Sequence, residues 1–265
     1  MTKEHLLARL HLRALLPTLA ELVRIDESAQ KIIENWNFTV RFTSATGIST
    51  TLQFKKGTLF VDPERRFYFP LNLMFASDKQ VNNLFTKQDR AVPIPIWGLQ
   101  YLPAMLHFQK LTNRLENILK ASVKDLQSDE DLLRKHVRLL MGRVIPAAVA
   151  QLGTYEAESQ AILKSKVGMI QIEVKDESIK SWIQCSTIGR NGDSRPSLRS
   201  GFGAAPTAPD FIMSFRDLPT ALLSINNELD TMAAATGCDI SIRGSLPLGE
   251  AVSMIMERVA LYLKN

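Results

Sequence analysis

The stretch that decides the fold is ISIRGSLPLGEAVSMIMERVALYL, residues 240–263. It reads as a short alternating strand, a glycine turn and a long apolar helix in direct succession. A second stretch with the same order, IPIWGLQYLPAMLHFQKLTNRLENIL, occupies residues 94–119. At an offset of 146 the strand isoleucines coincide, and Gly98 meets Gly244. We therefore predict that one structural unit is present twice in the chain.

The segments just before these two stretches also correspond. PLNLMFASDKQVNNLF (70–85) and PDFIMSFRDLPTALLS (209–224) each read as an alternating strand that runs into a helix. Asp78 and Asp217 stand in register where the helix should begin. We expect them to be N-cap residues or acids of the first turn.

A β-hairpin and a leading helix complete each predicted unit. The hairpins alternate strictly between apolar and polar residues, which is typical of half-buried strands. The leading helices are amphipathic, and the matching prolines Pro17 and Pro146 should break or kink them. The hairpins are expected at 38–54 and 170–185, and the helices at 14–33 and 143–163.

We therefore expect an α+β protein of two tandem domains, 1–128 and 129–265, divided in the polar stretch KDLQSDED. Each would contain a helix, a hairpin, a further strand, a helix, a strand and a helix. The second copy gains a glycine-rich insert at 189–209. We interpret the insert as a mobile surface loop. A contact with an anion or a lipid headgroup is the alternative, since the insert carries Arg190, Arg195 and Arg199.

The composition is that of an ordinary globular protein, with 45% hydrophobic and 22% charged residues among 265. Residues 1–128 carry 17 Lys and Arg against 11 Asp and Glu, whereas residues 129–265 carry 15 against 16. A basic half can meet lipid headgroups or nucleic acid, but these cations are scattered, so a solvated surface is favoured. Cys185 and Cys238 form no disulfide or zinc pattern, which suits a reducing compartment.

Signatures of catalysis and metal binding are missing from the sequence. The four histidines, His5, His11, His107 and His136, form no H-x-x-x-H or H-x-E pair. No G-x-S-x-G, Walker or dinucleotide-binding motif appears. We expect no enzyme activity, no metal and no cofactor, and we interpret both cysteines as buried structural thiols.

The last helix is apolar around most of its circumference. Val252, Ile255, Val259 and Tyr262 form a stripe with helical spacing, and Met254 and Met256 broaden it. Such a helix must be covered on more than one side, so core packing is one interpretation. The other is that it forms a wall of an apolar cavity, in which the flexible methionines adapt to a bound lipid.

Three segments of the second half carry a family resemblance: GMIQIEV (168–174), PDFIMSFRDLPTALLS (209–224) and ATGCDISIRGSLPLGEAVSMIM (235–256). They show a strand beginning with glycine, an Asp-containing step from strand to helix, and a glycine-flanked strand before a last helix. In these features the second half resembles the sterol carrier protein (type 2) domain family. The first half joins it through the internal match.

The resemblance implies a roughly five-stranded, mixed, curved sheet in each domain, backed by helices and enclosing an apolar tunnel. It implies non-catalytic binding of a fatty acid, an acyl-CoA, a sterol or a quinone-like lipid. Charged replacements at Val252 or Ile255 should then abolish lipid uptake in a folded protein. By position, the residues implied to line the tunnel are Leu222, Leu223, Leu248, Val252, Ile255 and Met256.

The function expected from the sequence is thus binding or transfer of a lipid or other apolar small molecule in the cytoplasm. The C-terminal LKN lacks a peroxisomal tripeptide, which favours that location. We expect no nucleic-acid partner; a transient contact with a membrane surface and an unidentified protein partner stay open. The alternative is a protein-interaction or accessory module, in which the domains pack as a pseudo-dimer without a cavity. An enzyme is the third choice.

Overall fold

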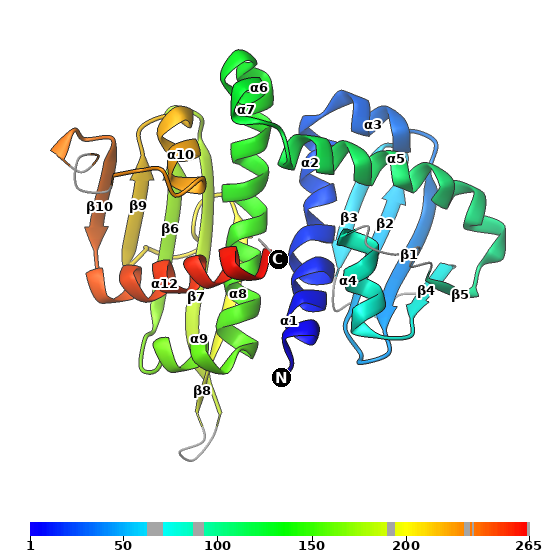
Figure 1. The fold of residues 1–265 in the computed structure, drawn as a ribbon, viewed down its shortest axis with the longest axis horizontal. Helices are drawn as coiled ribbons and strands as arrows, with labels where there is room; N and C mark the ends of the chain where they lie inside the picture. The colour runs from blue at the N-terminus through cyan, green and yellow to red at the C-terminus, as the bar shows by residue number, and fades with distance from the viewer. Residues whose placement is uncertain (63–70, 87–92, 190–193, 231–233, 235, 264–265) are drawn as a thin grey trace. The chain divides into compact units, whose positions relative to one another are not determined.

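The computed structural model describes residues 1–62, 71–86, 93–189, 194–230, 234 and 236–263. The chain forms two compact units, Met1–Ala121 (unit 1) and Ser122–Asn265 (unit 2), each drawn in Figure 1. The sequence analysis placed the division after residue 128 instead. Residues Val123–Ser128 form helix α6, which packs on the following helix of unit 2 and buries Leu126. This short helix therefore belongs with the second unit.

The elements of unit 1 follow one another from helices through a sheet to a last helix (Figure 1). The helices are α1 Lys3–Leu10, the π-helical η1 His11–Leu15, the 3-10 segment η2 Leu16–Thr18, α2 Leu19–Ile25, α3 Glu27–Ile33, α4 Asp78–Thr86, the 3-10 segment η3 Leu99–Tyr101 and α5 Leu102–Leu119. The strands are β1 Asn37–Ser44, β2 Ser49–Lys55, β3 Thr58–Asp62, β4 Leu71–Phe75 and β5 Ile94–Trp97.

Unit 2 has its elements in the corresponding order, after the additional helix α6. The helices are α6 Val123–Ser128, α7 Glu130–Leu139, the π-helical η4 Leu140–Val144, α8 Ile145–Tyr155, α9 Ala157–Ile162, α10 Leu218–Ile225 and α12 Leu246–Leu263. The strands are β6 Gly168–Val174, β7 Ile179–Ile188, β8 Arg195–Phe202, β9 Phe211–Phe215 and β10 Ile240–Gly244.

Both units contain a mixed five-stranded sheet with the same strand order. Along the sheet the strands run β3-β2-β1-β4-β5 in unit 1 and, in the equivalent direction, β8-β7-β6-β9-β10 in unit 2. The central pairs β1–β4 and β6–β9 are parallel, and the other pairs are antiparallel. The fold is therefore α+β with two sheets backed by helices, as the sequence analysis predicted.

The edge strands β3 and β8 were not recognised in the sequence. In particular, β8 lies inside the 189–209 insert, which we interpreted as a surface loop; residues 190–193 of that insert lie outside the described residues. Strand β8 pairs with β7 but buries only Leu198 fully, so it lacks the alternation that marks a half-buried strand. A Cβ at Gly201 would lie 2.4 Å from the Trp182 ring, so a glycine is needed for this pairing.

In unit 1 the leading helix changes its hydrogen-bond pattern at Pro17, where the sequence predicts a break or a kink: a π-helical segment is followed by a 3-10 segment while the backbone stays helical. The π-helical segment η1 ends with the Leu16 amide donating to the carbonyl of His11. In a π-helix each amide donates to the carbonyl five residues earlier. The amide of residue 17 would therefore donate to the carbonyl of Leu12. Proline has no amide hydrogen, and Thr50 Oγ1 from strand β2 donates to the Leu12 carbonyl instead, at 2.5 Å.

In unit 2 a proline also leaves one helix carbonyl without an amide donor, and a sheet hydroxyl also donates to it. Its π-helical segment η4 directly precedes Pro146, and the Ile145 amide donates to the carbonyl of Leu140. The carbonyl of Met141 then lacks an amide donor. Ser181 Oγ from strand β7 donates to it at 2.8 Å. A hydroxyl of the sheet thus replaces the missing backbone donor in both units.

An ion pair of a buried carboxylate with an arginine connects the last helix of each unit to a junction between two earlier helices, α2–α3 in unit 1 and α8–α9 in unit 2. In unit 1, Arg114 of α5 binds Asp26 with both nitrogens, at 2.7 and 3.2 Å. In unit 2, Arg258 of α12 binds Glu156 at 2.6 and 2.8 Å, and the Tyr262 hydroxyl donates to the same carboxylate at 2.8 Å. These pairs fix the last helices over the junctions α2–α3 and α8–α9.

The sheet register corrects the sequence match of Asp78 with Asp217. Phe75 of β4 and Phe215 of β9 are equivalent, because each ends the strand that pairs in parallel with β1 or β6. Counting two residues onward, Asp217 corresponds to Ser77. Both are N-caps: the Asp217 side chain accepts from the Thr220 amide, and Ser77 Oγ accepts from the Gln80 amide. Asp78 is instead a first-turn acid of α4.

Candidate functional site

Unit 2 contains a surface cavity of about 260 Å³ between helices α6, α7 and α10. Volumes of about 300–1,000 Å³ are typical of sites that hold small molecules, so this cavity is slightly smaller than that range. Its eight lining residues are Val123, Gln127, Leu133, Pro219, Leu222, Leu223, Asn226 and Glu228.

Helix α10 supplies both the floor and the rim of the cavity. Asp217 caps the helix and Pro219 lies in its first turn, which starts α10 directly after strand β9. Leu222 is 5% exposed and faces the core together with Leu133 of α7, whereas the next residue, Leu223, is 41% exposed. The cavity therefore has an apolar floor and an apolar edge that meets solvent.

The polar part of the cavity wall consists of two amides and one carboxylate. Gln127 comes from α6, Asn226 is the C-cap residue of α10, and Glu228 follows it. Among the eight lining residues there is no lysine, arginine or histidine. Such a wall can hold an apolar group and offer hydrogen bonds at its rim.

The cavity contains two of the six residues that were expected to line a tunnel. Leu222 and Leu223 are in its wall. The other four, Leu248, Val252, Ile255 and Met256, lie on α12 and are not among its lining residues.

Helix α12 packs tightly on the sheet and on its neighbouring helices. It contacts β6, β9, α8 and α9. A Cβ at Gly249 would lie 2.3 Å from the Phe211 ring, and one at Gly168 would lie 2.8 Å from Leu248. Ile255 is fully buried. A charge at Val252 or Ile255 would therefore be placed in the core, and we now expect it to unfold unit 2 rather than to affect ligand uptake alone.

The sequence analysis missed the cavity residues Val123, Gln127 and Leu133. Their segment, KDLQSDED and its flanks, was interpreted as a polar boundary between domains. The apolar spacing of Val123, Leu126 and Leu133 across the two short helices was the available signal, since three- and four-residue spacings mark one helix face.

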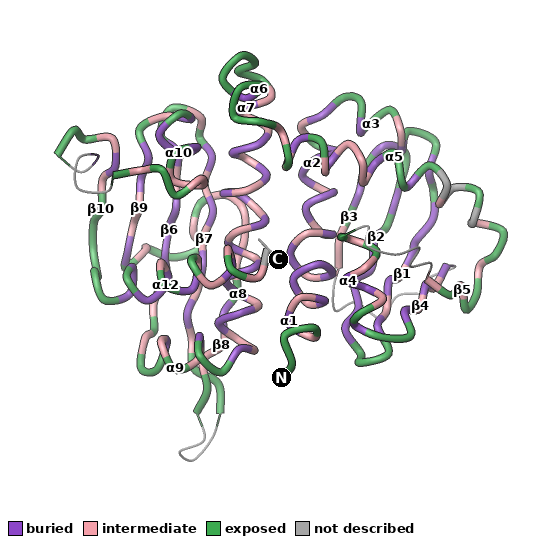
Figure 2. The backbone as a smooth tube through the Cα atoms, viewed as in Figure 1, coloured by how far each residue is buried: buried purple, intermediate pink, exposed green. Residues whose placement is uncertain are grey.

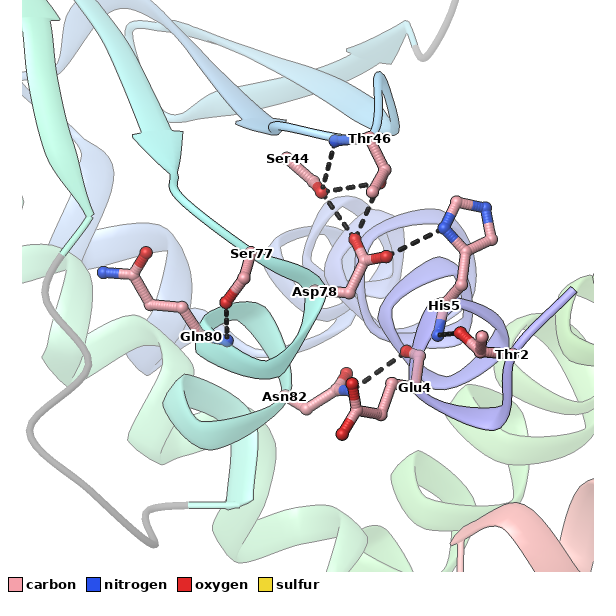
Figure 3. Close-up of polar contacts among 9 residues, drawn as sticks. All are labelled: Thr2, Glu4, His5, Ser44, Thr46, Ser77, Asp78, Gln80 and Asn82. Atoms are coloured by element: carbon pink, nitrogen blue, oxygen red, sulfur yellow. Dashed lines mark hydrogen bonds and ion pairs between the residues drawn. The ribbon is translucent and has the colours of Figure 1, made fainter.

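A separate candidate site, a cluster of polar side chains, lies in unit 1 around the carboxylate of Asp78 (Figure 3). Ser44 and Thr46 donate their hydroxyls to it at 2.6 and 2.7 Å, and His5 Nδ1 lies 2.8 Å from its other oxygen. Burial alone would raise the pKa of Asp78, but these hydrogen bonds outweigh it and hold the pKa below its ordinary value. The carboxylate thus joins α1, α4 and the β1–β2 turn.

This cluster does not have the arrangement of a hydrolytic triad. Ser44 donates to the carboxylate of Asp78, so no imidazole accepts its hydroxyl hydrogen as the histidine of a triad would. Nearby, His11 is buried, stacks on Phe85 at 4.7 Å and shares a hydrogen bond of 3.1 Å with Asn82. Burial lowers the pKa of His11 to about 4, so the ring is neutral at neutral pH.

The cysteines, and the groupings of possible metal ligands, give no further candidate site among the described residues. Cys185 is buried, and burial raises its pKa to about 12; Cys238 is exposed, contrary to our expectation of a buried thiol. Within the described residues, no three His, Cys, Asp or Glu side chains are grouped so that they could hold a metal ion. No described helix is both long and apolar enough to cross a membrane.

Comparisons with known proteins give partial structural matches. No family model matches the sequence, and no curated protein matches it. A crystal structure of sterol carrier protein 2 matches 43% of this chain and 92% of its own, at 12% identity and a TM-score of 0.31.

Two further matches carry related names. A possible sterol carrier protein from Thermus thermophilus has 16% identity and a TM-score of 0.30, over 44% of this chain and 85% of its own. Sterol Carrier Protein 2 from Yarrowia lipolytica, in its apo form, has 10% identity and a TM-score of 0.28, over 42% and 92%. These names are those of the family that the sequence resembles. At such low scores the matches say nothing about a ligand, and the geometry of the cavity has to support any function.

Proposed function

We propose that unit 2 binds an apolar small molecule of the lipid class, without catalysis, in the cavity between α6, α7 and α10. The observation that carries this proposal is the cavity wall itself, in which five of the eight lining side chains are apolar. Leu222 and Leu223, two of the residues proposed from the sequence, provide its floor and edge.

The driving force would be removal of apolar surface from water. Each Å² of apolar surface that ligand and protein bury together contributes about 25 cal/mol. The exposed part of Leu223 would be covered by the ligand, and no bond is made or broken. The cavity can hold one short apolar segment, so the rest of a longer molecule would extend from its mouth.

The proposal includes the tandem duplication of the sterol-carrier-like unit. Support comes from the shared strand order, from the matching prolines with their sheet hydroxyls, and from the matching arginine–carboxylate pairs. A cytoplasmic location and a transient contact with a membrane surface also belong to the proposal.

The alternative, a protein-interaction module, is favoured by one surface of unit 1. Strand β5 and segment η3 expose four large apolar side chains, and Trp97 and Leu99 are each 62% exposed. Large exposed apolar side chains are a feature of interaction sites. Figure 2 shows that the edge strands β5 and β10 are more exposed than the central strands β1 and β6. The four residues are Ile94, Ile96, Trp97 and Leu99.

Native mass spectrometry of the purified protein, followed by organic extraction, would first show whether an apolar molecule is retained. Calorimetric titration with decanol then tests the cavity directly. Leu223→Gln should weaken decanol binding about tenfold, because a buried leucine contributes about 1.5–3 kcal/mol. The matched control is Leu246→Gln, another exposed leucine of unit 2 that does not line the cavity. Equal affinities in Leu223→Gln and in the unchanged protein would refute the site.

A further inference from the structure

The charged side chains around the cavity are mainly negative. Glu228 is an exposed carboxylate that lines the cavity, and the described residues of the cavity wall include no lysine or arginine. Within the described part of the chain, no ion pair is formed by the Glu228 side chain. The nearest charge that a ligand would meet at the mouth is therefore negative.

The two segments that supply the cavity wall extend this pattern. Residues 122–133 and 219–228 carry one cation, Lys124, against five carboxylates. Two of the five are balanced, because Glu130 pairs with Arg134 and Asp131 pairs with Lys135. The carboxylates are Asp125, Asp129, Glu130, Asp131 and Glu228.

Two others accept local hydrogen bonds from uncharged groups. Asp129 accepts from the Leu132 amide as the N-cap of α7, and Asp125 accepts from the Ser122 hydroxyl. Neither contact supplies a positive side chain. The field at the cavity mouth therefore opposes an approaching anion.

From these charges we infer that the cavity selects uncharged apolar molecules over carboxylates and phosphates with the same apolar chain. This inference rests on the proposed function and narrows it. An anionic head at the mouth would be repelled by Glu228 and would find no lysine or arginine to pair with among the lining residues. An uncharged hydroxyl or carbonyl would meet the amides of Gln127 and Asn226, which both donate and accept hydrogen bonds.

The inference divides the ligand classes expected from the sequence. Fatty acids and acyl-CoA carry a carboxylate or phosphates, so the cavity disfavours them. Sterols and quinone-like molecules carry hydroxyl or carbonyl groups, so the cavity accepts them. The chemistry that distinguishes the two groups at the cavity mouth is the charge of the head, since all four classes carry a large apolar part.

The test compares two probes that differ only in the head: decanol, which is uncharged, and decanoate, which is ionised at neutral pH. Both are titrated into the full-length protein by calorimetry at low ionic strength. Decanol should bind about tenfold more tightly, which corresponds to about 1.4 kcal/mol. The preference should shrink as salt is added, because exposed charges are screened.

Glu228→Gln should strengthen decanoate binding severalfold and thereby reduce the preference for decanol over decanoate. Glu257→Gln is the matched control, since Glu257 is an exposed carboxylate of α12 that does not line the cavity. It should leave both affinities unchanged.

Each outcome separates this inference from the function on which it rests. Decanoate that binds as tightly as decanol overturns the charge selection but leaves the apolar site in place. A preference that Glu228→Gln does not reduce also overturns it. If neither probe binds, the proposed function itself is refuted.

Discussion

Unit 1 and unit 2 each have a five-stranded sheet of the same strand order and a proline in the leading helix. They differ in the side chains that pack between the sheet and the helices. In unit 1, aromatic rings from β1, β2 and α5 pack together: Phe42 lies 5.5 Å from Phe108, and Phe38 lies 5.1 Å from Phe54. In unit 2 the equivalent central strands present mainly aliphatic side chains, namely Ile170, Ile172, Val174, Ile179 and Ile183.

This difference shows which features the architecture needs and which it leaves free. The proline leaves one helix carbonyl without an amide donor in both units, and the sheet hydroxyl satisfies that carbonyl. The arginine satisfies the buried carboxylate in the same way in both units. The side chains that fill the interior vary, because many apolar sets satisfy the same volume. Function can therefore differ between the units while the architecture stays the same.

Removing one arginine from a helix junction should produce the largest loss of stability. Arg258→Ala would leave the buried Glu156 without its cation, and Arg114→Ala would remove from the buried Asp26 the guanidinium that binds both of its oxygens. We expect the free energy of unfolding of the affected unit to fall by about 3 kcal/mol in each case. Urea unfolding combined with hydrogen exchange would assign each loss to its unit.

The control for this pair is Arg216→Ala, since Arg216 forms its ion pairs with Asp217 and Asp239 on the surface. It should leave the unfolding midpoint unchanged. If Arg258→Ala behaves like this control, the junction in unit 2 does not depend on the ion pair.

Acid should act on unit 1 through His11, with an effect of similar size. The unfolded chain takes up a proton near pH 6.5, whereas burial lowers the pKa of His11 to about 4. Stability is thus fully present above pH 6.5 and declines as the pH falls toward 4, by about 3 kcal/mol in total. His11→Gln should flatten this dependence in denaturant titrations at several pH values.

His107 provides the comparison, because it is exposed on α5 of the same unit. His107→Gln should retain the pH dependence of the unchanged protein. A dependence that persists in His11→Gln would assign the acid sensitivity to another group.

The two sheet hydroxyls should give smaller and matched effects. Thr50→Val and Ser181→Ala each leave one buried carbonyl without a donor, at Leu12 and Met141. We expect each to lower the free energy of unfolding of its own unit by about 1–3 kcal/mol. Hydrogen exchange should show faster exchange in the leading helix of the altered unit.

Thr58→Val, at an exposed position of β3, is the control for the hydroxyl variants. It should change neither the exchange of the leading helix nor the unfolding midpoint. A loss in one unit without a loss in the other would show that the shared hydrogen bond is equivalent in geometry but not in energy.

The sequence by itself determined the features that depend on local chemistry. Strict alternation marked the hairpins, the spacing of apolar residues marked the helices, and Pro17 and Pro146 marked where the helical hydrogen-bond pattern changes, because proline lacks an amide hydrogen wherever it stands. Leu222 and Leu223 could be named as candidate ligand contacts through a family resemblance carried by the same local patterns.

Only the tertiary structure decided the features that depend on distant partners. Strands β3 and β8 have weak alternation and exist because β2 and β7 offer unpaired backbone edges. The correspondence of Asp217 with Ser77 follows from parallel pairing, which the sequence does not display. The cavity forms only where α6, α7 and α10 meet, and about a hundred residues of chain separate the first of these helices from the last. Apolar spacing predicts which face of a helix is buried, but it does not predict which other helix covers that face.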